Sequence, residues 1–380
     1  MLDLTQYDQV FVLTDEQAAQ CCLPVFHSLH CLQPILANHV LSLSNSQPCL
    51  ADIPTLVLPS GEQHKNLSSV QRIWDFLFAH NATRASLLIN IGGGVICDMG
   101  GFAAATYKRG IAFMNIPTTL LAMVDAATGG KTGIDYTPMS IVNCQLSIIK
   151  NAIGVFAEPV DTIIEPRFLA TLPPEQLLSG FAEMLKHALL MSPKAFAELI
   201  DYDLREVTTP AFGELIRQSV AFKQSITSQD PHDNGLRQQL NFGHTVGHAI
   251  ESLLLEKNLQ LSTLNSPTSF NSQLSTFNYY LHGYCVLYGL VAESYLSHAL
   301  CGLPAEVVST LSRFMMENYG AAPITCKDYD RLLQLMQHDK KNREQGAVTC
   351  TLLSAIGQPV IGQTIPPDLL RESIEYLCSL

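Results

Sequence analysis

Short runs of β-forming residues alternate with a helix-type pattern in the first half of the chain. The runs are QVFVLT (9–14), TLVLP (55–59), SLLINI (86–91), AFMNIP (112–117) and DTIIE (161–165). Between two of them, KNLSSVQRIWDFLFAH (65–80) repeats apolar residues at helical spacing. Such alternation predicts a mostly parallel sheet with helices on both faces, and a ligand crevice at the carboxyl ends of the strands.

The pattern changes near Arg167. Long segments with helical apolar spacing follow, namely PPEQLLSGFAEMLKHALLMS, FGELIRQSVAFKQSIT, FGHTVGHAIESLLL and GYCVLYGLVAESYLSHAL, and strand signals are few before AVTCTLLSA (347–355). The sequence therefore predicts an α/β domain over 1–168 and an all-α C-terminal domain over 169–380. A cleft between the domains is the expected active site.

Two segments rich in Ser, Asn, Thr and Gln fit neither domain, 137–149 and 257–278. They share a short repeat, which reads NCQLSI, NLQLST and NSQLST. Biased polar repeats rarely form a packed core. We interpret both segments as low-complexity insertions in surface loops, with a binding lid as the alternative.

Composition excludes several classes of protein. Of 380 residues, 47% are apolar and 15% are charged, which is typical of a globular enzyme. A net charge of −12 argues against a nucleic-acid partner. The eleven cysteines include no CxxC pair, which favours reduced thiols in the cytoplasm. The chain shows neither a basic signal-peptide start nor an apolar run of about 18 residues, so we expect no membrane span.

A glycine run follows the third predicted strand. In INIGGGVICDMGGFAAA (90–106), Gly92, Gly93 and Gly94 would let the backbone approach a pyrophosphate at the start of a helix. The spacing differs from GxGxxG, so a tight strand-to-helix turn without a ligand is an equal alternative. Two further turns, PSGEQHKN (59–66) and VDAATGGKTGID (124–135), suit phosphate contacts but also ordinary exposed loops.

Histidines and one glutamate recur on the predicted helices. NFGHTVGHAIES (241–252) places His244 and His248 four residues apart, so both rings face the same way. They could share one metal ion, or one could be a ligand and the other an acid–base group. GFAEMLKHALL (180–190) places Glu183 beside Lys186 on an apolar helix, and His282 begins another helix. The missing glutamate of HExxH disfavours a zincin protease.

The few cations are concentrated near these motifs. Only 22 lysines and arginines are present, and those in or beside the motifs are Arg109, Lys131, Lys150, Lys186, Lys223, Arg237, Lys340 and Lys341. Such clustering predicts a pocket for a phosphorylated, carboxylated substrate.

On these motifs the sequence resembles the 3-dehydroquinate synthase family. The stretches that carry the resemblance are SGEQHKN, GGGVICDMGGFAAATYKRGIAFMNIPTTLLAMVDAATGGKTGID, KNAIGVF, LATLPPEQLLSGFAEMLKH, LNFGHTVGHAIE, LHG and HDKK. The resemblance spans most of 7–345. It implies a nucleotide-binding α/β domain followed by a helical domain, with NAD and one divalent metal ion, Zn²⁺ or Co²⁺, as cofactors.

The resemblance also implies a role for each motif position. The metal ligands fall on Glu183, His244 and His282, and His248 then becomes a group that contacts the substrate. The other substrate positions are Arg109, Asp125, Lys131, Asn151, Lys186, Lys223, Arg237, Asn241 and Lys340. The NAD positions are Asp15, Gly61, Glu62, Lys65, Gly93, Gly94, Asp98, Thr118, Thr119, Lys131, Lys150 and Thr171.

The implied substrate is 3-deoxy-arabino-heptulosonate 7-phosphate, which would be converted to 3-dehydroquinate and phosphate with transient reduction of NAD. This is a lyase step of the shikimate pathway of aromatic amino acid biosynthesis, and the resemblance suggests a homodimer. The alternatives are a sister sugar-phosphate cyclase, a metal-dependent polyol dehydrogenase and a relic without catalysis.

Three features depart from the family pattern. Tyr284 replaces the usual acidic residue after LHG, and Cys97 replaces a glycine in the NAD turn. The polar segments also separate motifs: one precedes Lys150 and Asn151, and the other precedes His282. We expect Tyr284 to influence metal affinity through His282.

Overall fold

The computed structural model describes residues 6–27, 53–137, 149–264, 281–337 and 347–380, with side chains of 258–264 left aside. The chain forms two compact units. Unit 1 comprises Met1–Pro173 and Arg205–Gln224, and unit 2 comprises Pro174–Leu204 and Ser225–Leu380. The first division lies close to the domain boundary expected at 168/169, whereas the return of 205–224 to unit 1 was not foreseen.

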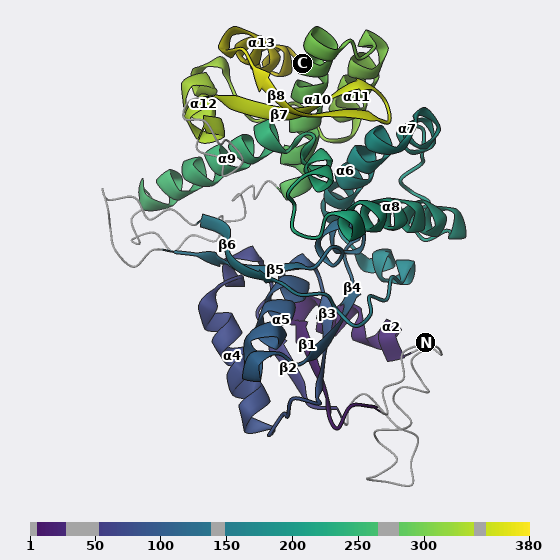
Figure 1. Ribbon diagram of the computed structural model, residues 1–380, viewed down its shortest axis with the longest axis vertical. Coiled ribbons are helices and arrows are strands. Elements are labelled where there is room, and N and C mark those ends of the chain that lie inside the picture. The colour runs from purple at the N-terminus through teal and green to yellow at the C-terminus, as the bar shows by residue number, and fades with distance from the viewer. Residues whose placement is uncertain (1–5, 28–52, 138–148, 265–280, 338–346) are drawn as a thin grey trace. The chain divides into compact units, whose positions relative to one another are not determined.

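A parallel sheet of four strands organises unit 1, shown in purple and blue in Figure 1. Its strands are β1 (Val10–Asp15), β2 (Thr55–Leu58), β3 (Leu87–Gly92) and β4 (Ala112–Pro117), in the order β2-β1-β3-β4. All six residues of β3 are buried. Such a continuous apolar run is what a strand covered on both faces requires.

Helices and a β-ribbon complete unit 1. The helices are α1 (Glu16–Cys21), α2 (Leu23–His27), α4 (Leu67–Ala79), α5 (Gly94–Thr106) and α8 (Pro210–Gln229), which continues into unit 2. The short helical turns are η3 (Glu62–His64), η4 (Tyr107–Arg109), η5 (Ala122–Ala126) and η6 (Pro166–Thr171). Strands β5 (Lys131–Tyr136) and β6 (Ile149–Phe156) form an antiparallel ribbon, in which Tyr136 pairs with Ile149.

The core of unit 1 lies between the sheet and the helices α4 and α5. Phe11, Val70, Ile73, Leu88 and Met99 are among its buried members. Small residues let α5 lie close to the sheet, because a Cβ on Gly100 would be 2.0 Å from the Asn90 side chain. The strand ends and the N-terminus of α5 are thereby fixed next to each other.

One expected strand is absent from the described residues. DTIIE (161–165) makes only an isolated parallel bridge, between Thr162 and Asn115 of β4. Neighbouring backbone bonds, such as Ile163 N–H to the Asn115 carbonyl at 2.9 Å, keep it beside β4 without extending into a ladder. The composition is β-forming, but the pairing is too short for a strand.

Unit 2 is mainly helical. Its elements are α6 (Pro174–Met191), α7 (Pro193–Ile200), η7 (Leu236–Asn241), α9 (His244–Leu264), α10 (His282–Cys301), α11 (Ala305–Asn318), η8 (Cys326–Asp328), α12 (Tyr329–Gln337) and α13 (Pro367–Ser379), with the hairpin β7 (Val348–Ala355) and β8 (Gln358–Ile365). Helix α10 is apolar almost all round and is buried against α6, α9, α11, α13 and β7.

The predicted polar segments fall largely outside the described residues. Of 137–149, residues 138–148 are not described, and of 257–278, residues 265–278 are not described. Helix α9 continues to Leu264 and so includes the first part of the second segment. In the part of the chain that the structure describes, no helix combines the length and apolar character that a membrane span requires.

Candidate active-site residues in the two units

The glycine run of unit 1 forms the expected turn from strand to helix. Strand β3 ends at Gly92, Gly93 caps α5, and Gly94 is the first helical residue. A Cβ on Gly93 would lie 3.2 Å from the Thr119 side chain, so the backbone there is crowded on one side. The N–H of Thr118 donates to the Gly92 carbonyl at 2.9 Å. This geometry suits close approach of a phosphate to a helix N-terminus.

Cys97 fits the turn without strain. It lies within α5 as a buried residue, and its Sγ is 3.9 Å from the Gly92 carbonyl oxygen. Cys97 is not one of the described residues with a left-handed backbone, so a side chain at this position causes no backbone strain. Burial raises the pKa of the Cys97 thiol and keeps it neutral.

Lys65 joins two predicted site residues. Its Nζ lies 2.6 Å from Asp98 Oδ2 and 2.6 Å from Asn151 Oδ1, and only 5% of the residue is exposed. Burial lowers the pKa of Lys65, but the carboxylates of Asp98 and Glu62 outweigh burial and raise it. The ammonium is therefore held in its charged form between the two side chains.

Asn151 adopts a left-handed backbone with φ of 47°. Its N–H donates to Asp135 Oδ1 at 2.8 Å, and its side chain accepts from Lys65. Conformations of this kind cost free energy and persist where neighbouring groups hold them. Strand β6 thus presents Lys150 and Asn151 in a fixed arrangement directly after the segment 138–148.

Asp125 and Lys223 form a second ion pair in unit 1. Asp125 lies on η5, a single π-helical turn, and Lys223 comes from α8. The Lys223 Nζ donates to Asp125 Oδ1 and to the Asp125 carbonyl, both at 2.6 Å. The structure thus brings together two residues that are far apart in the sequence and that the motifs assign to the substrate.

Three of the other NAD positions, Asp15, Gly61 and Glu62, lie at or just after the ends of β1 and β2. Asp15 caps α1 and accepts from Ser60 Oγ at 2.7 Å. Gly61 has φ of 115°, which a glycine adopts without cost, and Lys150 Nζ lies 3.9 Å from Glu62 Oε1. Arg109, Lys131 and Thr171 are exposed.

The metal-type side chains of unit 2 meet around Glu183. Its carboxylate is fully buried on α6, and its Oε1 lies 3.5 Å from His244 Nε2 and 3.4 Å from His282 Nε2. Lys186, one turn further along α6, pairs with Oε2 and is only 2% exposed. Within the described residues, neither Glu183 oxygen accepts a well-aligned hydrogen bond. A carboxylate buried in this way requires positive charge nearby.

These distances fit a shared metal ion. Ligands bound to zinc at roughly 2.0–2.1 Å in a tetrahedron lie about 3.3 Å from one another. The other ring nitrogens are held elsewhere: His244 Nδ1 is 3.2 Å from the Phe242 carbonyl, and His282 Nδ1 is 3.2 Å from Glu251 Oε2. Both Nε2 atoms are thus turned toward Glu183.

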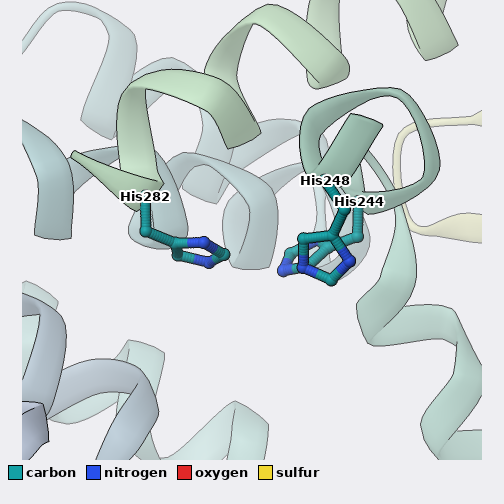
Figure 2. Close-up of side chains that lie close together, drawn as sticks. All are labelled: His244, His248 and His282. Carbon is teal, nitrogen blue, oxygen red and sulfur yellow. The ribbon is translucent and has the colours of Figure 1, made fainter. Parts of the chain in front are cut away.

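His248 belongs to the same cluster. Figure 2 shows the rings of His244, His248 and His282 converging from two helices, and ligand atoms of all three lie within 4.8 Å of one another. The ring centroids of His248 and His282 are 5.8 Å apart. The geometry thus admits two ligand sets, one with Glu183 and one with His248.

Electrostatics favour a cation in this cluster. Burial raises the pKa of Glu183, but Lys186 and His244 outweigh it and hold the pKa well below its usual range. Burial lowers the pKa of His282, but Glu251 and Glu183 outweigh it and raise it to about 10. Two carboxylates therefore stabilise positive charge around His282, which a proton or a divalent ion could supply.

Two buried glutamates near the cluster escaped the sequence reasoning. Glu251 of α9 contacts His282, and Glu293 of α10 accepts from the N–H groups of Gly243 at 2.6 Å and Val246 at 3.0 Å. Glu293 thereby caps the start of α9, next to His244. For Glu293 the available signal was a single glutamate on the otherwise apolar helix α10, the same signal that drew attention to Glu183.

Two of the remaining predicted residues of unit 2, Arg237 and Asn241, lie on η7. Arg237 is 4% exposed and donates to the Pro231 carbonyl at 3.0 Å, and Asn241 ends η7 close to His244 in the chain. Tyr284 packs against Tyr319, with ring centroids 4.9 Å apart. Lys340 and Lys341 lie outside the described residues.

Comparison with known proteins places these motifs in one family. The family model "3-dehydroquinate synthase N-terminal" matches residues 55–179, and "3-dehydroquinate synthase C-terminal" matches 180–261 and 272–342. A 3-dehydroquinate synthase of Parabacteroides distasonis is 39% identical over 375 residues, covering 99% of this chain and 93% of the relative.

Solved structures share the fold. A 2-epi-5-epi-valiolone synthase from Streptomyces hygroscopicus, with NAD⁺ and Zn²⁺ bound, has a TM-score of 0.74 at 22% identity. The match covers 98% of this chain and 91% of the synthase chain. A 2-deoxy-scyllo-inosose synthase complexed with carbaglucose-6-phosphate, NAD⁺ and Co²⁺ has a TM-score of 0.72 at 22% identity, covering 99% and 92%. By the match of both family models and of the relative, the chain belongs to the 3-dehydroquinate synthase family.

Proposed function

We propose that the protein converts 3-deoxy-arabino-heptulosonate 7-phosphate to 3-dehydroquinate and phosphate, with NAD and one divalent metal ion as cofactors. The observation that carries the proposal is the buried Glu183 carboxylate with two imidazole Nε2 atoms at 3.5 and 3.4 Å, in a chain of this family. We infer a cytoplasmic lyase of the shikimate pathway that acts as a homodimer.

The residues that would hold the cofactors are divided between the units. Glu183, His244 and His282 would bind Zn²⁺ or Co²⁺, and the turn at Gly93 and Gly94 would receive the NAD pyrophosphate. The remaining NAD positions are Asp15, Gly61, Glu62, Lys65, Asp98, Thr118, Thr119, Lys131, Lys150 and Thr171. When bound, these groups supply reversible hydride transfer and stabilisation of negative charge on a substrate oxygen.

The chain's own side chains would bind and orient the substrate. The cations Arg109, Lys131, Lys186, Lys223, Arg237 and Lys340 would neutralise the phosphate and carboxylate, and Asp125, Asn151 and Asn241 would orient hydroxyl groups. Lys65 and Asp135 hold Asn151 before any ligand arrives. Such preorganisation lowers the barrier, because less reordering accompanies the reaction.

A phosphate-release assay tests the proposal. Purified protein would receive the heptulosonate phosphate, NAD below the substrate concentration and Zn²⁺, with and without a chelator. Release that exceeds the NAD supply and stops with the chelator is expected, because NAD is regenerated in each turnover. Stoichiometric accumulation of NADH would instead indicate a polyol dehydrogenase. Turnover only of a neutral sugar phosphate would indicate a sister cyclase, and no turnover despite folding would indicate a relic.

Histidine variants distinguish the two possible ligand sets. If Glu183, His244 and His282 are the ligands, His244→Ala lowers zinc affinity by at least 10-fold, whereas His248→Ala retains zinc and loses phosphate release, because His248 serves in proton transfer. Equal loss of zinc in both variants would instead support a set of three histidines. Zinc content after dialysis, measured alongside activity, separates the two results.

A further inference from the structure

Glu251 is buried beside the metal-type cluster and has no assigned role in the reaction. It lies on α9 with 7% of its surface exposed. Its Oε2 is 3.2 Å from His282 Nδ1. His282 begins α10, so the contact joins two helices whose residues are 31 positions apart.

The His282 ring lies between two carboxylates. Its Nδ1 faces Glu251, and its Nε2 faces Glu183 Oε1 at 3.4 Å. An imidazole binds a metal through one nitrogen while the other carries a proton, and the acceptor of that proton fixes the orientation of the ring. The carboxylate also makes the ligating nitrogen more basic.

We propose that Glu251 is a positioning residue that accepts the Nδ1 proton of His282 and thereby directs the Nε2 lone pair toward the metal position beside Glu183. The inference rests on the proposed metal site. His244 has a neutral partner at the same ring atom, the Phe242 carbonyl at 3.2 Å. Glu251 therefore supplies negative charge behind one imidazole of the set, in addition to orienting it.

A competition assay measures the effect on metal affinity. Zinc affinity would be determined against a chromophoric chelator for the unmodified protein, Glu251→Ala and Glu251→Gln. We expect Glu251→Ala to bind zinc about 10- to 100-fold more weakly. Glu251→Gln should lose less zinc affinity, because its amide oxygen still accepts the hydrogen bond from Nδ1–H although it carries no charge.

Glu256 offers a matched control on the same helix. Its carboxylate pairs with Arg331, whose Nε lies 2.9 Å away, and its side chain is 35% exposed. Glu256→Gln removes a paired carboxylate from α9 without touching a histidine, so zinc affinity should not change. Circular dichroism and NAD affinity check folding, and Glu251→Gln carries the test if Glu251→Ala does not fold.

A second readout reports the proton itself. In the zinc-loaded protein, the ¹⁵N-coupled proton on His282 Nδ1 should exchange slowly with water, and it should exchange faster in Glu251→Ala. Unchanged zinc affinity and unchanged exchange in Glu251→Ala would overturn the inference.

The assays also separate this inference from the proposed function. Zinc binding by the unmodified protein without phosphate release would reject the proposed reaction and leave the role of Glu251 measurable through affinity. Full activity with equal zinc affinity in Glu251→Ala would reject the inference alone. An unmodified protein that binds neither Zn²⁺ nor Co²⁺ would reject both.

Discussion

Glu183 is a buried charge that is compensated by its partners. Its side chain is 0% exposed and that of Lys186 is 2% exposed. Contacts of Glu183 with Lys186 and His244 therefore replace contacts with water. Removing one member of such a pair leaves an uncompensated buried charge. The residue that we assign to metal binding is therefore also a residue on which the packing of α6 depends.

Glu183→Gln should lower both stability and metal affinity. In chelator, where no metal contributes, we expect a loss of about 3–5 kcal/mol in the free energy of unfolding, because Lys186 stays buried without its carboxylate. Urea denaturation measures this loss, and zinc affinity should fall at least 10-fold. Glu198→Gln is the control: its pair with Lys194 spans 3.7 Å between side chains that are 41% and 85% exposed. That variant should change stability by less than about 1 kcal/mol.

At the scale of elements, α9 and α10 hold the histidine cluster in two ways. The helices pack closely, and each contributes a glutamate that contacts a residue at the start of the other helix. Glu251 of α9 contacts His282 of α10, and Glu293 of α10 caps the start of α9. Glycines make the approach possible, because a Cβ on Gly289 would lie 1.9 Å from the Gly243 carbonyl oxygen. The position of His244 relative to His282 thus depends on the separation of these two helices.

Gly289→Ala should force the helices apart. We expect a loss of about 1–3 kcal/mol in the free energy of unfolding, together with weaker zinc binding, because His244 moves with the start of α9. Gly213→Ala on α8 is the matched control. Its nearest atom outside its own neighbours would be Pro166 Cγ at 3.4 Å, an ordinary contact. The free energy of unfolding of that variant should rise by up to about 1 kcal/mol through helix propensity. A change of the same sign in the free energy of unfolding of both variants would contradict the packing argument.

Asp328 ties α9 to the start of α12. It accepts from Lys257 Nζ and Thr325 N, both at 2.8 Å. Burial raises the pKa of Asp328, but these partners outweigh burial and lower it. Because the pKa is lower in the folded state, the stabilisation is complete above the unfolded value of about 3.9 and is lost as pH falls through the folded pKa.

Asp328→Asn should therefore destabilise the protein at pH 7 by about 1 kcal/mol, the usual contribution of a cap. The difference from the unmodified protein should shrink as pH falls below about 4, where the aspartate of the unfolded state becomes protonated first. Urea denaturation at several pH values measures both effects. A difference that stays constant from pH 7 to pH 3 would show that the carboxylate charge contributes nothing.

The elements differ in how well the sequence predicts them. Strands β1 and β3 are confirmed at nearly the expected bounds, because buried apolar runs carry a strong local signal. Strands β5, β6 and β8 were missed, since Gly133, Gly154 and Gly362 interrupt the β-forming pattern. The set Glu183, His244 and His282 was implied by the family resemblance, whereas helix spacing placed only His244 and His248 on one face. Glu251 and Glu293 were missed because their partners lie 31 and 50 residues away.

At the scale of the whole molecule, the candidate residues are divided by chemistry. The glycine turn and the cluster of Lys65, Asp98 and Asn151 belong to unit 1, whereas Glu183 and the histidines belong to unit 2. Each set is held by contacts within its own unit, such as Lys65 to Asp98 at 2.6 Å and His282 to Glu251 at 3.2 Å. On the proposed assignment, NAD would bind to unit 1 and the metal ion to unit 2, while the proposed reaction needs both.

Removal of the metal should therefore abolish turnover and leave NAD binding nearly intact. After dialysis against a chelator, we expect phosphate release to fall at least 100-fold, because no other group replaces a metal ion in stabilising charge on the substrate oxygen. Calorimetric titration should give an NAD dissociation constant within about 3-fold of the zinc-loaded value, since a coupling of 1.4 kcal/mol would already change it tenfold. Lys65→Met provides the converse: the loss of the Lys65 contacts to Asp98 and Asn151 should weaken NAD binding while zinc affinity is retained. A chelated protein that no longer binds NAD would show instead that the two units are energetically coupled, and that the metal organises unit 1 as well as unit 2.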